Sequence, residues 1–352
     1  MKVGKYFHDY AIGHNNNFNL LRFVAASLVL VTHSFAISTG RSDSEPLRTA
    51  LGITLGSVAV DIFYIASGYL VTSSLLFRKN LREFIFARAL RIFPGLWVSL
   101  AVTTLAIGLW FTSFSFTAFF SDPGTWKFLV RNAVLISGLV WTLPGAFFGN
   151  PGLAVNGSLW SLPVEIKMYL VLAAIWIGLG LLRLDKARWL SAACVSIAVV
   201  GTGLSLIYFL DGAQSGLIYL GAMFFSGAAV RVLQNRIRAS HAFAFILVIA
   251  LLVAAVQHRI AFDILYRLSL PYLVIYFALV PAGIIRRFNS YGDYSYGIYI
   301  YAFPVQQALV HVWRDIGPYQ MMGTSFAITF FLAFASWHLI EQRALGLKAK
   351  FK

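Results

Sequence analysis

The stretch FNLLRFVAASLVLVTHSFAI, residues 18–37, decides the fold of this chain. It would be an ordinary membrane span except that it contains Arg22 and His33. Eleven positions separate the two, which places both side chains on one helix face about 16 Å apart. A cation and an imidazole inside a bilayer are costly unless they face a polar cavity. The alternative is that Arg22 extends to the inner interface and His33 makes a structural hydrogen bond.

The composition indicates a polytopic membrane protein. The 352 residues are 59% hydrophobic and 12% charged, with a mean hydropathy of +0.76. A soluble protein is nearer half apolar and a quarter charged. The single cysteine, Cys194, excludes an intrachain disulfide. No metal-binding spacing such as CxxC or HExxH occurs, so we expect no metal.

Hydrophobic runs that alternate with short basic loops predict an all-α bundle of about ten transmembrane helices with both termini in the cytoplasm. We expect spans at 18–38, 51–76, 92–112, 159–180, 189–209, 216–233, 241–256, 268–285, 294–312 and 322–340. The apolar piece 126–140 is short and carries two cations, which favours an interfacial helix. Arg259 and Arg267 fall in an expected outer loop, where cations are unusual.

One domain is expected to fill residues 1–352. Residues 1–17 form a cytoplasmic lead, residues 341–352 form a basic cytoplasmic tail, and no fused extracytoplasmic domain is expected. The net charge of +15 lies in short loops, so it indicates orientation in the membrane and attraction to anionic lipids, and we expect no nucleic-acid partner. The sequence says nothing about the oligomeric state.

Two acidic residues stand inside or beside predicted spans. Asp61 is an intramembrane carboxylate, and Glu165 follows Asn156-Gly157-Ser158 and Pro163 near the start of a helix. Such a carboxylate can hold the tautomer of a histidine and balance its charge during general-base catalysis. The alternatives are a structural hydrogen bond between helices for Asp61 and an interfacial helix cap for Glu165.

A cluster of cations precedes the third span. Its arginines are Arg78, Arg82, Arg88 and Arg91. Arg88 and Arg91 are three positions apart on one helix face, where two guanidinium groups can bind a phosphate. The alternative is an ordinary positive-inside loop.

Five segments resemble the acyltransferase-3 family of integral-membrane acyltransferases, in the order that the family has them. They are NLLRFVAASLVLVTHSF with its Arg-x10-His motif, AVDIFYIASGYLV, FIFARALRIFPGLW, SLWSLPVEIKMYL and YSYGIYIYAFPV. Two positions depart from the family: Ala302 stands where histidine is frequent, and Arg343 stands where an Ile-Glu-x-Pro pattern has proline. The second departure weakens any inference about Glu341.

The resemblance implies O-acyl transfer, usually of acetyl, from cytoplasmic acyl-CoA to a hydroxyl of a carbohydrate. The acceptor would be a bacterial surface polysaccharide or its lipid-linked precursor, and the protein would lie in the bacterial inner membrane. No cofactor is expected to stay bound, because acyl-CoA is a substrate. The acyl group itself, acetyl or longer, is left open, as is the need for a separate partner protein.

The geometry and the resemblance together predict a distribution of roles. His33 acts as general base, with Glu165 or else Asp61 orienting its ring. The phosphates of acyl-CoA bind Arg88 and Arg91, with Arg78 and Arg82 nearby, and Arg22 lines the route of the donor. The predicted acceptor-binding residues are Ser158, Trp160 and Tyr69. No stabiliser of the reaction's oxyanion can be named from the sequence.

Two other function classes compete with this prediction. A secondary transporter or flippase for a polar or glycan substrate could also bury Arg, Asp, Glu and His along a substrate path. No inverted repeat or pair of broken helices supports it. A structural membrane subunit leaves the buried ionisable residues without a purpose.

Overall fold

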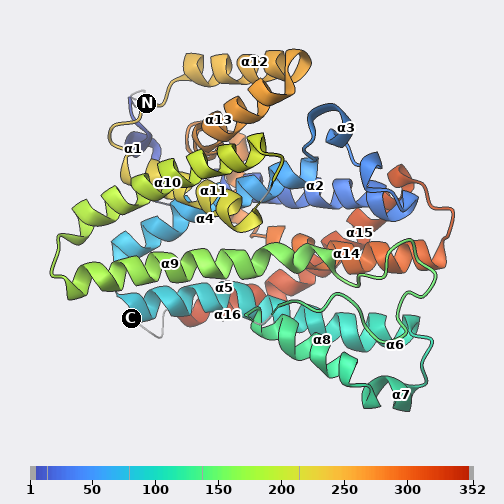
Figure 1. Cartoon of the computed structure of the whole chain (residues 1–352). Coiled ribbons are helices and arrows are strands. Elements are labelled where there is room, and N and C mark those ends of the chain that lie inside the picture. Colours follow the sequence, from blue (N-terminus) through green and yellow to red (C-terminus); the bar gives the residue numbers. More distant parts are fainter. Residues whose placement is uncertain (1–4, 14, 79, 137, 214, 349–352) are drawn as a thin grey trace. The chain divides into compact units, whose positions relative to one another are not determined.

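The computed structural model describes residues 5–13, 15–78, 80–136, 138–213 and 215–348. This part of the chain consists of helices joined by loops, without a strand. The α-helices, labelled in Figure 1, are α1 Phe7–Tyr10, α2 Phe18–Thr39, α3 Arg48–Leu51, α4 Leu55–Arg78, α5 Leu81–Val102, α6 Leu109–Phe111, α7 Phe116–Ser121, α8 Pro123–Val134, α9 Leu162–Leu181, α10 Lys186–Leu210, α11 Gly216–Val232, α12 His241–Gln257, α13 Arg259–Leu279, α14 Ser295–Val312, α15 Pro318–Ser336 and α16 Gln342–Gly346. Shorter helices of other types include the 3-10 helix η3, Gly157–Ser161, and the π-helix η5, Trp337–Glu341.

Seven helices in the described ranges are long and apolar enough to cross a membrane. They are Phe18–Thr39, Leu55–Arg78, Leu81–Phe111, Gly157–Leu181, Lys186–Leu210, Arg259–Leu279 and Pro318–Gly346. The predicted all-α, multi-pass membrane protein is thereby confirmed. Helices α11 and α12 are apolar but have only 17 residues each. The count of ten spans and the cytoplasmic placement of both termini stay predictions, and part of the predicted lead and tail (1–4, 14 and 349–352) lies outside the described residues.

Helix α13 corrects the predicted span at 268–285. The helix begins at Arg259 and ends at Leu279, so Arg259 and Arg267 belong to it and not to an outer loop. Arg267 Nε lies 2.5 Å from Asp263 Oδ2, one turn earlier, and both side chains are buried. The prediction failed because a charge that is neutralised at i,i+4 on the same helix can enter an apolar bundle. The predicted interfacial piece at 126–140 corresponds to the short helix α8, Pro123–Val134.

Contacts divide the chain into two compact units. Unit 1 comprises Met1–Arg22, Val60–Leu81 and Val164–Gly292, and unit 2 comprises Phe23–Ala59, Arg82–Pro163 and Asp293–Lys352. Each unit is built from segments far apart in the sequence, and α2, α4 and α9 each contribute to both. The single domain expected over 1–352 stays a prediction.

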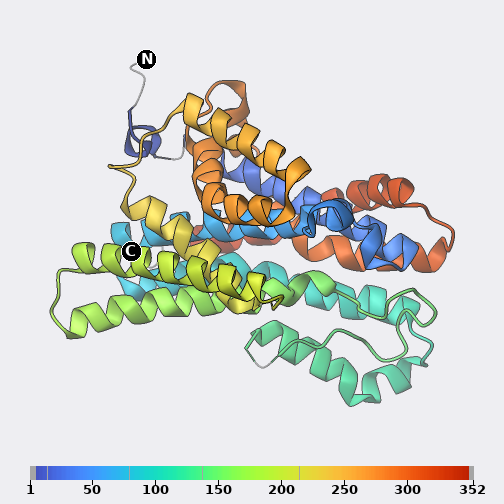
Figure 2. The same cartoon turned by 45° about the horizontal axis from the view of Figure 1, so that its top comes forward.

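In unit 1, α10 packs against α11, and α12 runs beside α13 (Figure 2). Glycine permits the closest helix approach in this unit. A Cβ on Gly68 of α4 would lie 1.8 Å from the backbone oxygen of Phe224, and one on Gly227 of α11 would lie 2.0 Å from that of Ile65. Any side chain at either position would therefore force α4 and α11 apart.

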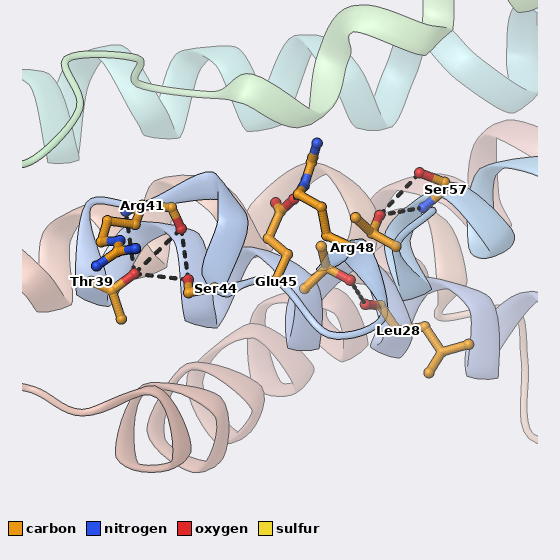
Figure 3. Close-up of polar contacts among 9 residues, drawn as sticks. Leu28, Thr39, Arg41, Ser44, Glu45, Arg48 and Ser57 are labelled. Atoms are coloured by element: carbon orange, nitrogen blue, oxygen red, sulfur yellow. Dashed lines mark hydrogen bonds and ion pairs between the residues drawn. The ribbon is translucent and has the colours of Figure 1, made fainter. Parts of the chain in front are cut away.

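In unit 2, α14 packs against α15, and a cluster of buried apolar side chains links them to the C-terminal half of α2. The loop after α2 folds through its own short-range polar contacts (Figure 3). Arg41 donates two hydrogen bonds to Asp43, which lower the pKa of that carboxyl below its ordinary value. Arg48 donates from Nε and Nη2 to Glu45 Oε2, with 2.5 Å between Nη2 and Oε2. This loop holds the end of α2 that follows His33.

Candidate active site

His33 lies in the C-terminal half of α2, half-buried against α14 in unit 2. Its imidazole meets the ring of Phe303 edge to face, with 5.1 Å between the ring centroids. Gln306, one turn further along α14, donates from Nε2 to the carbonyl oxygen of Leu30 and to Ser34 Oγ, both at 2.9 Å. These bonds lie on either side of His33 in the sequence. They fix the register of this part of α2 against α14, and the role of His33 as a base stays a prediction.

Arg22 lies on the same uninterrupted helix, eleven residues before His33. Its guanidinium stands 5.9 Å from the ring centroid of Phe63 in unit 1, a cation–π contact. The helical spacing expected from the sequence is therefore present along α2. Its role along the donor route stays a prediction.

The turn that precedes α9 is fastened to α14 within unit 2. Asn156 Nδ2 donates to the carbonyl oxygen of Ile300 at 2.8 Å. The hydroxyl of Tyr299 donates to the carbonyl oxygen of Ser158 at 2.5 Å and shares a 2.7 Å hydrogen bond with Ser161 Oγ. Ser158 is buried, whereas 43% of Trp160 is exposed. Of the two, Trp160 is the one that can stack on a sugar ring.

Glu165 and Asp61 belong to unit 1, each with hydroxyl partners. Glu165 Oε1 accepts hydrogen bonds from Ser67 Oγ, at 2.9 Å, and from the hydroxyl of Tyr169. Asp61 Oδ2 accepts from the hydroxyls of Tyr219, at 2.6 Å, and Tyr266, at 2.7 Å. Both carboxylates are held by O–H donors, so their orientation is fixed. Their predicted action on the ring of His33, which belongs to unit 2, stays a prediction.

Tyr69, one of the predicted acceptor-binding residues, is buried in unit 1. Its hydroxyl donates to Gln234 Oε1 at 2.7 Å, and the guanidinium of Arg231 lies 6.0 Å from its ring centroid. The ring also stacks on Phe18. These contacts connect α2, α4 and α11 and describe a packing residue, and contact with an acceptor stays a prediction.

The predicted phosphate-binding arginines differ in their surroundings. Arg91 Nη2 lies 2.5 Å from Asp293 Oδ2, and Arg91 Nη1 lies 3.7 Å from Glu341 Oε2. Its guanidinium also stands 5.8 Å from the ring centroid of Tyr296. Arg88 is half-buried on the same helix, and Arg82 is exposed. Arg78 ends α4 in unit 1. The phosphate-binding roles stay predictions, and in Arg91 the charge is already balanced by protein carboxylates.

Several residues of this region were not predicted from the sequence. Asp293, Gln306 and Tyr299 carry hydrogen bonds or ion pairs that hold unit 2 together. The sequence favours an interfacial belt or packing for the tyrosines around α14. A usable signal existed, because Tyr296, Tyr299, Phe303 and Gln306 recur every three or four residues and so share one helix face.

The described part of the chain contains no group of three or more His, Cys, Asp or Glu side chains that could hold a metal ion. Cys194, the only cysteine of the sequence, is buried in α10. The expectation that no metal and no bound cofactor take part stays a prediction.

Comparison with known proteins gives an independent view of the chain. The model of the acyltransferase-3 family, an acyltransferase domain, matches residues 15–340. The O-acetyl transferase of Shigella phage Sf6 is 30% identical over 350 residues, which cover 94% of this chain and 96% of that protein. Nodulation protein 10 of Rhizobium leguminosarum bv. viciae is 28% identical, with coverage of 97% and 96%.

A further relative is longer than this chain. The peptidoglycan O-acetyltransferase OatA of Listeria monocytogenes is 27% identical over a region that covers 81% of this chain but only 51% of that protein. No solved structure matches the chain. The family model and these relatives confirm the predicted O-acyltransferase. With the match extending over nearly all the helices described above, the chain belongs to the acyltransferase-3 family of multi-pass membrane acyltransferases.

Proposed function

We propose that this protein transfers an acetyl group from acetyl-CoA, supplied at the cytoplasmic face of a bacterial inner membrane, to a hydroxyl of a carbohydrate. The acceptor is a surface polysaccharide or its lipid-linked precursor. The relatives support this choice, since one is an O-acetyl transferase and another is a peptidoglycan O-acetyltransferase, and the sugars of peptidoglycan carry hydroxyls. The observation that carries the proposal is the single helix α2, which bears Arg22 and His33 on one face.

The reaction needs a base at the acceptor hydroxyl, and His33 supplies it. His33 takes the proton of the hydroxyl as its oxygen attacks the thioester carbonyl carbon, which gives a tetrahedral oxyanion. The carbon–sulfur bond then breaks, the acetyl ester remains on the acceptor, and the departing thiolate of CoA receives the proton held by His33. Atoms and charges balance without any further reactant.

Donor and acceptor approach this histidine from opposite sides of the membrane. The phosphates of acetyl-CoA stay at the cytoplasmic end, where α5 begins with its arginines. The pantetheine arm extends along the face of α2 from Arg22 to His33, about 16 Å for eleven helical residues. The acceptor arrives from the outer side, where the exposed ring of Trp160 can stack on a sugar.

Among the arginines of α5, we assign the donor phosphates to Arg88, with Arg82 adding positive charge. Arg91 is paired with Asp293 and lies near Glu341, so carboxylates of unit 2 already neutralise its charge. A phosphate that approached Arg91 would meet two carboxylates. Arg91 therefore fixes α5 rather than binding the donor.

The test is the release of free CoA thiol by the purified protein in detergent, with acetyl-CoA as donor and soluble peptidoglycan fragments or water as acceptor. Wild type is expected to release thiol, and His33→Gln is expected to lose at least a hundredfold in rate because imidazole is the base. His258→Gln, which changes an exposed histidine, is the matched control and should keep the wild-type rate. Wild-type turnover in His33→Gln would refute the role of His33.

A further inference from the structure

The hydroxyl of Ser158 in unit 2 is buried and has no protein partner. Ser158 is 1% exposed, and its Oγ has no hydrogen-bond partner among the residues that the structure describes. The hydroxyls of Thr104 and Thr329 in the same unit are also buried without such a partner, and we single out Ser158 because its turn packs on Phe303. Its neighbours Asn156, Ser161 and Tyr299 are all hydrogen-bonded. A hydroxyl buried in a membrane protein without a partner is unfavourable, and a ligand that accepts its hydrogen bond would satisfy it.

The backbone of Ser158 is fixed on both sides. Its N–H donates to Asn156 Oδ1 at 3.2 Å, and its carbonyl oxygen accepts from the hydroxyl of Tyr299 at 2.5 Å. Asn156 is itself tied to α14 through the carbonyl oxygen of Ile300. Both backbone groups of Ser158 are thus used for positioning, and its side-chain hydroxyl is the polar group left over.

The turn that carries this hydroxyl packs on the part of α14 that touches the base. A Cβ on Gly157, the residue before Ser158, would stand 2.6 Å from Cε2 of Phe303, so the turn packs directly on that ring. The same ring also contacts the imidazole of His33, at 5.1 Å between centroids. His33 and the Gly157–Ser158 turn therefore share one aromatic neighbour within unit 2.

The position of Ser158 at a helix start favours negative charge there. η3 continues into α9, and together they form an apolar helix of 25 residues, Gly157–Leu181. The first N–H groups of a helix have no intrahelical acceptor and carry a partial positive charge. An anionic oxygen beside Ser158 would receive this field as well as the hydroxyl's hydrogen bond.

From these observations we propose that Ser158 Oγ–H donates a hydrogen bond to the oxyanion formed when the acceptor attacks the thioester. The inference rests on the proposed function and deepens it, since it assigns the group that stabilises the reaction's tetrahedral intermediate. No covalent bond to Ser158 forms or breaks. The carbonyl oxygen gains charge as the acceptor oxygen adds and loses it as the thiolate leaves.

Two alternatives at the same place are weaker. Gln306 Oε1 is also buried without a partner in the described structure, but a carbonyl oxygen accepts hydrogen bonds and cannot stabilise an oxyanion. Ser158 as a nucleophile would need a base at its Oγ. The hydroxyl of Tyr299, which contacts Ser158, instead donates a hydrogen bond to the backbone carbonyl oxygen of Ser158. The hydrogen-bond role uses the hydroxyl as it stands.

The experiment compares Ser158→Ala with Ser161→Ala in the thiol-release assay. Removal of one oxyanion donor typically lowers kcat by about 100- to 1000-fold. We expect this loss in Ser158→Ala, with KM for acetyl-CoA changed less than about threefold, because the charge develops only in the transition state. Ser161→Ala removes a neighbouring hydroxyl that is bonded to Tyr299, and we expect its kcat to stay within a few-fold of wild type.

A kcat of Ser158→Ala within threefold of wild type would overturn the inference. So would an acetyl ester found on Ser158 by mass spectrometry, because that would make the residue a nucleophile. Should Ser158→Ala fail to fold, the near-isosteric Ser158→Cys replaces it: a weak S–H donor should lower kcat at an unchanged melting temperature. If His33→Gln keeps its activity while Ser158→Ala loses it, the proposed base is wrong and the role of Ser158 stands.

Discussion

Two regions of unit 2 treat their buried polar groups in opposite ways. At the start of α14, Asp293 and Glu341 surround Arg91, and each carboxylate has a second partner in Ser295 or Ser336. Half-way along α14, His33 and the Ser158 turn lie against Phe303, and the Ser158 hydroxyl has no partner among the described residues. The first region pairs its charges internally, although Glu341 Oε2 takes part through the 3.7 Å ion pair and not through a hydrogen bond, and the second leaves a neutral hydroxyl unpartnered.

The difference suggests a structural role for the Arg91 region and a chemical role for the region around His33. The Arg91 region joins three segments, since Arg91 lies on α5, Asp293 precedes α14 and Glu341 belongs to the π-helix η5. Gly95, one turn after Arg91, lets the ring of Tyr296 and the Glu341 side chain approach α5 closely. A site whose charges are paired with one another can hold helices together but has little charge left for a substrate. The proposed mechanism therefore places the reaction in the region around His33.

The largest effect on stability should come from Arg91→Ala. The change would leave Asp293 and Glu341, whose side chains are 8% and 2% exposed, without their cation. Breaking a buried ion pair on one side costs about 3–5 kcal/mol, so the melting temperature in detergent should fall by many degrees. Arg82→Ala, which removes an exposed arginine from the same helix, is the control and should leave it nearly unchanged. Equal melting temperatures for the two variants would erase the proposed contrast between the regions.

A smaller effect is expected where the other region is packed most closely. Gly157→Ala would place a methyl group 2.6 Å from Phe303, and the ring must then shift relative to His33. Such overpacking costs about 1–3 kcal/mol, and turnover should fall along with the melting temperature. Gly178→Ala on α9 has open space around its Cβ and should leave turnover unchanged while stabilising the helix slightly. Normal turnover in Gly157→Ala would show that Phe303 does not position the histidine.

Much of the architecture follows from the sequence because apolar runs of sufficient length leave few alternatives in a membrane. The helix that carries Arg22 and His33, the polar turn at Asn156-Gly157 and the start of α9 were all expected. The early start of α13 was not, because Asp263 and Arg267 signal a loop until their pairing is known. A hydropathy score treats each charged residue separately, whereas the cost of burying a charge in a bilayer falls when an opposite charge neutralises it.

The candidate site shows the same limit. The Arg-x10-His spacing and the segment SLWSLPVEIKMYL identified His33, Ser158 and Glu165 as chemically relevant, but hydrogen-bond partners from distant segments define what each can do. Tyr299 and Gln306 are 138 or more residues from the turn or helix they hold. The ion pair of Arg91 with Asp293, 202 residues away, is likewise visible only in three dimensions. A motif gives the residue type, and the fold decides which other groups neutralise its charge.

The assignment of the donor phosphates to Arg88 and not to Arg91 leads to a prediction about the KM for acetyl-CoA. Its expected effect is the smallest of the three, and it discriminates best between the two arginines. Arg88→Ala should raise KM for acetyl-CoA about fivefold to tenfold, roughly 1 kcal/mol, with kcat and the melting temperature little changed. The effect of Arg88→Ala on KM should weaken at high salt. It should also become smaller when the donor lacks the phosphate that Arg88 contacts, and acetyl-3′-dephospho-CoA makes this test for the 3′-phosphate. Arg91→Lys is the matched comparison: it keeps the charge beside Asp293, so the ratio of its KM to the wild-type KM should be the same for both donors. If that ratio instead depended on the 3′-phosphate, Arg91 would contact the donor, and the start of α14 would belong to the binding site.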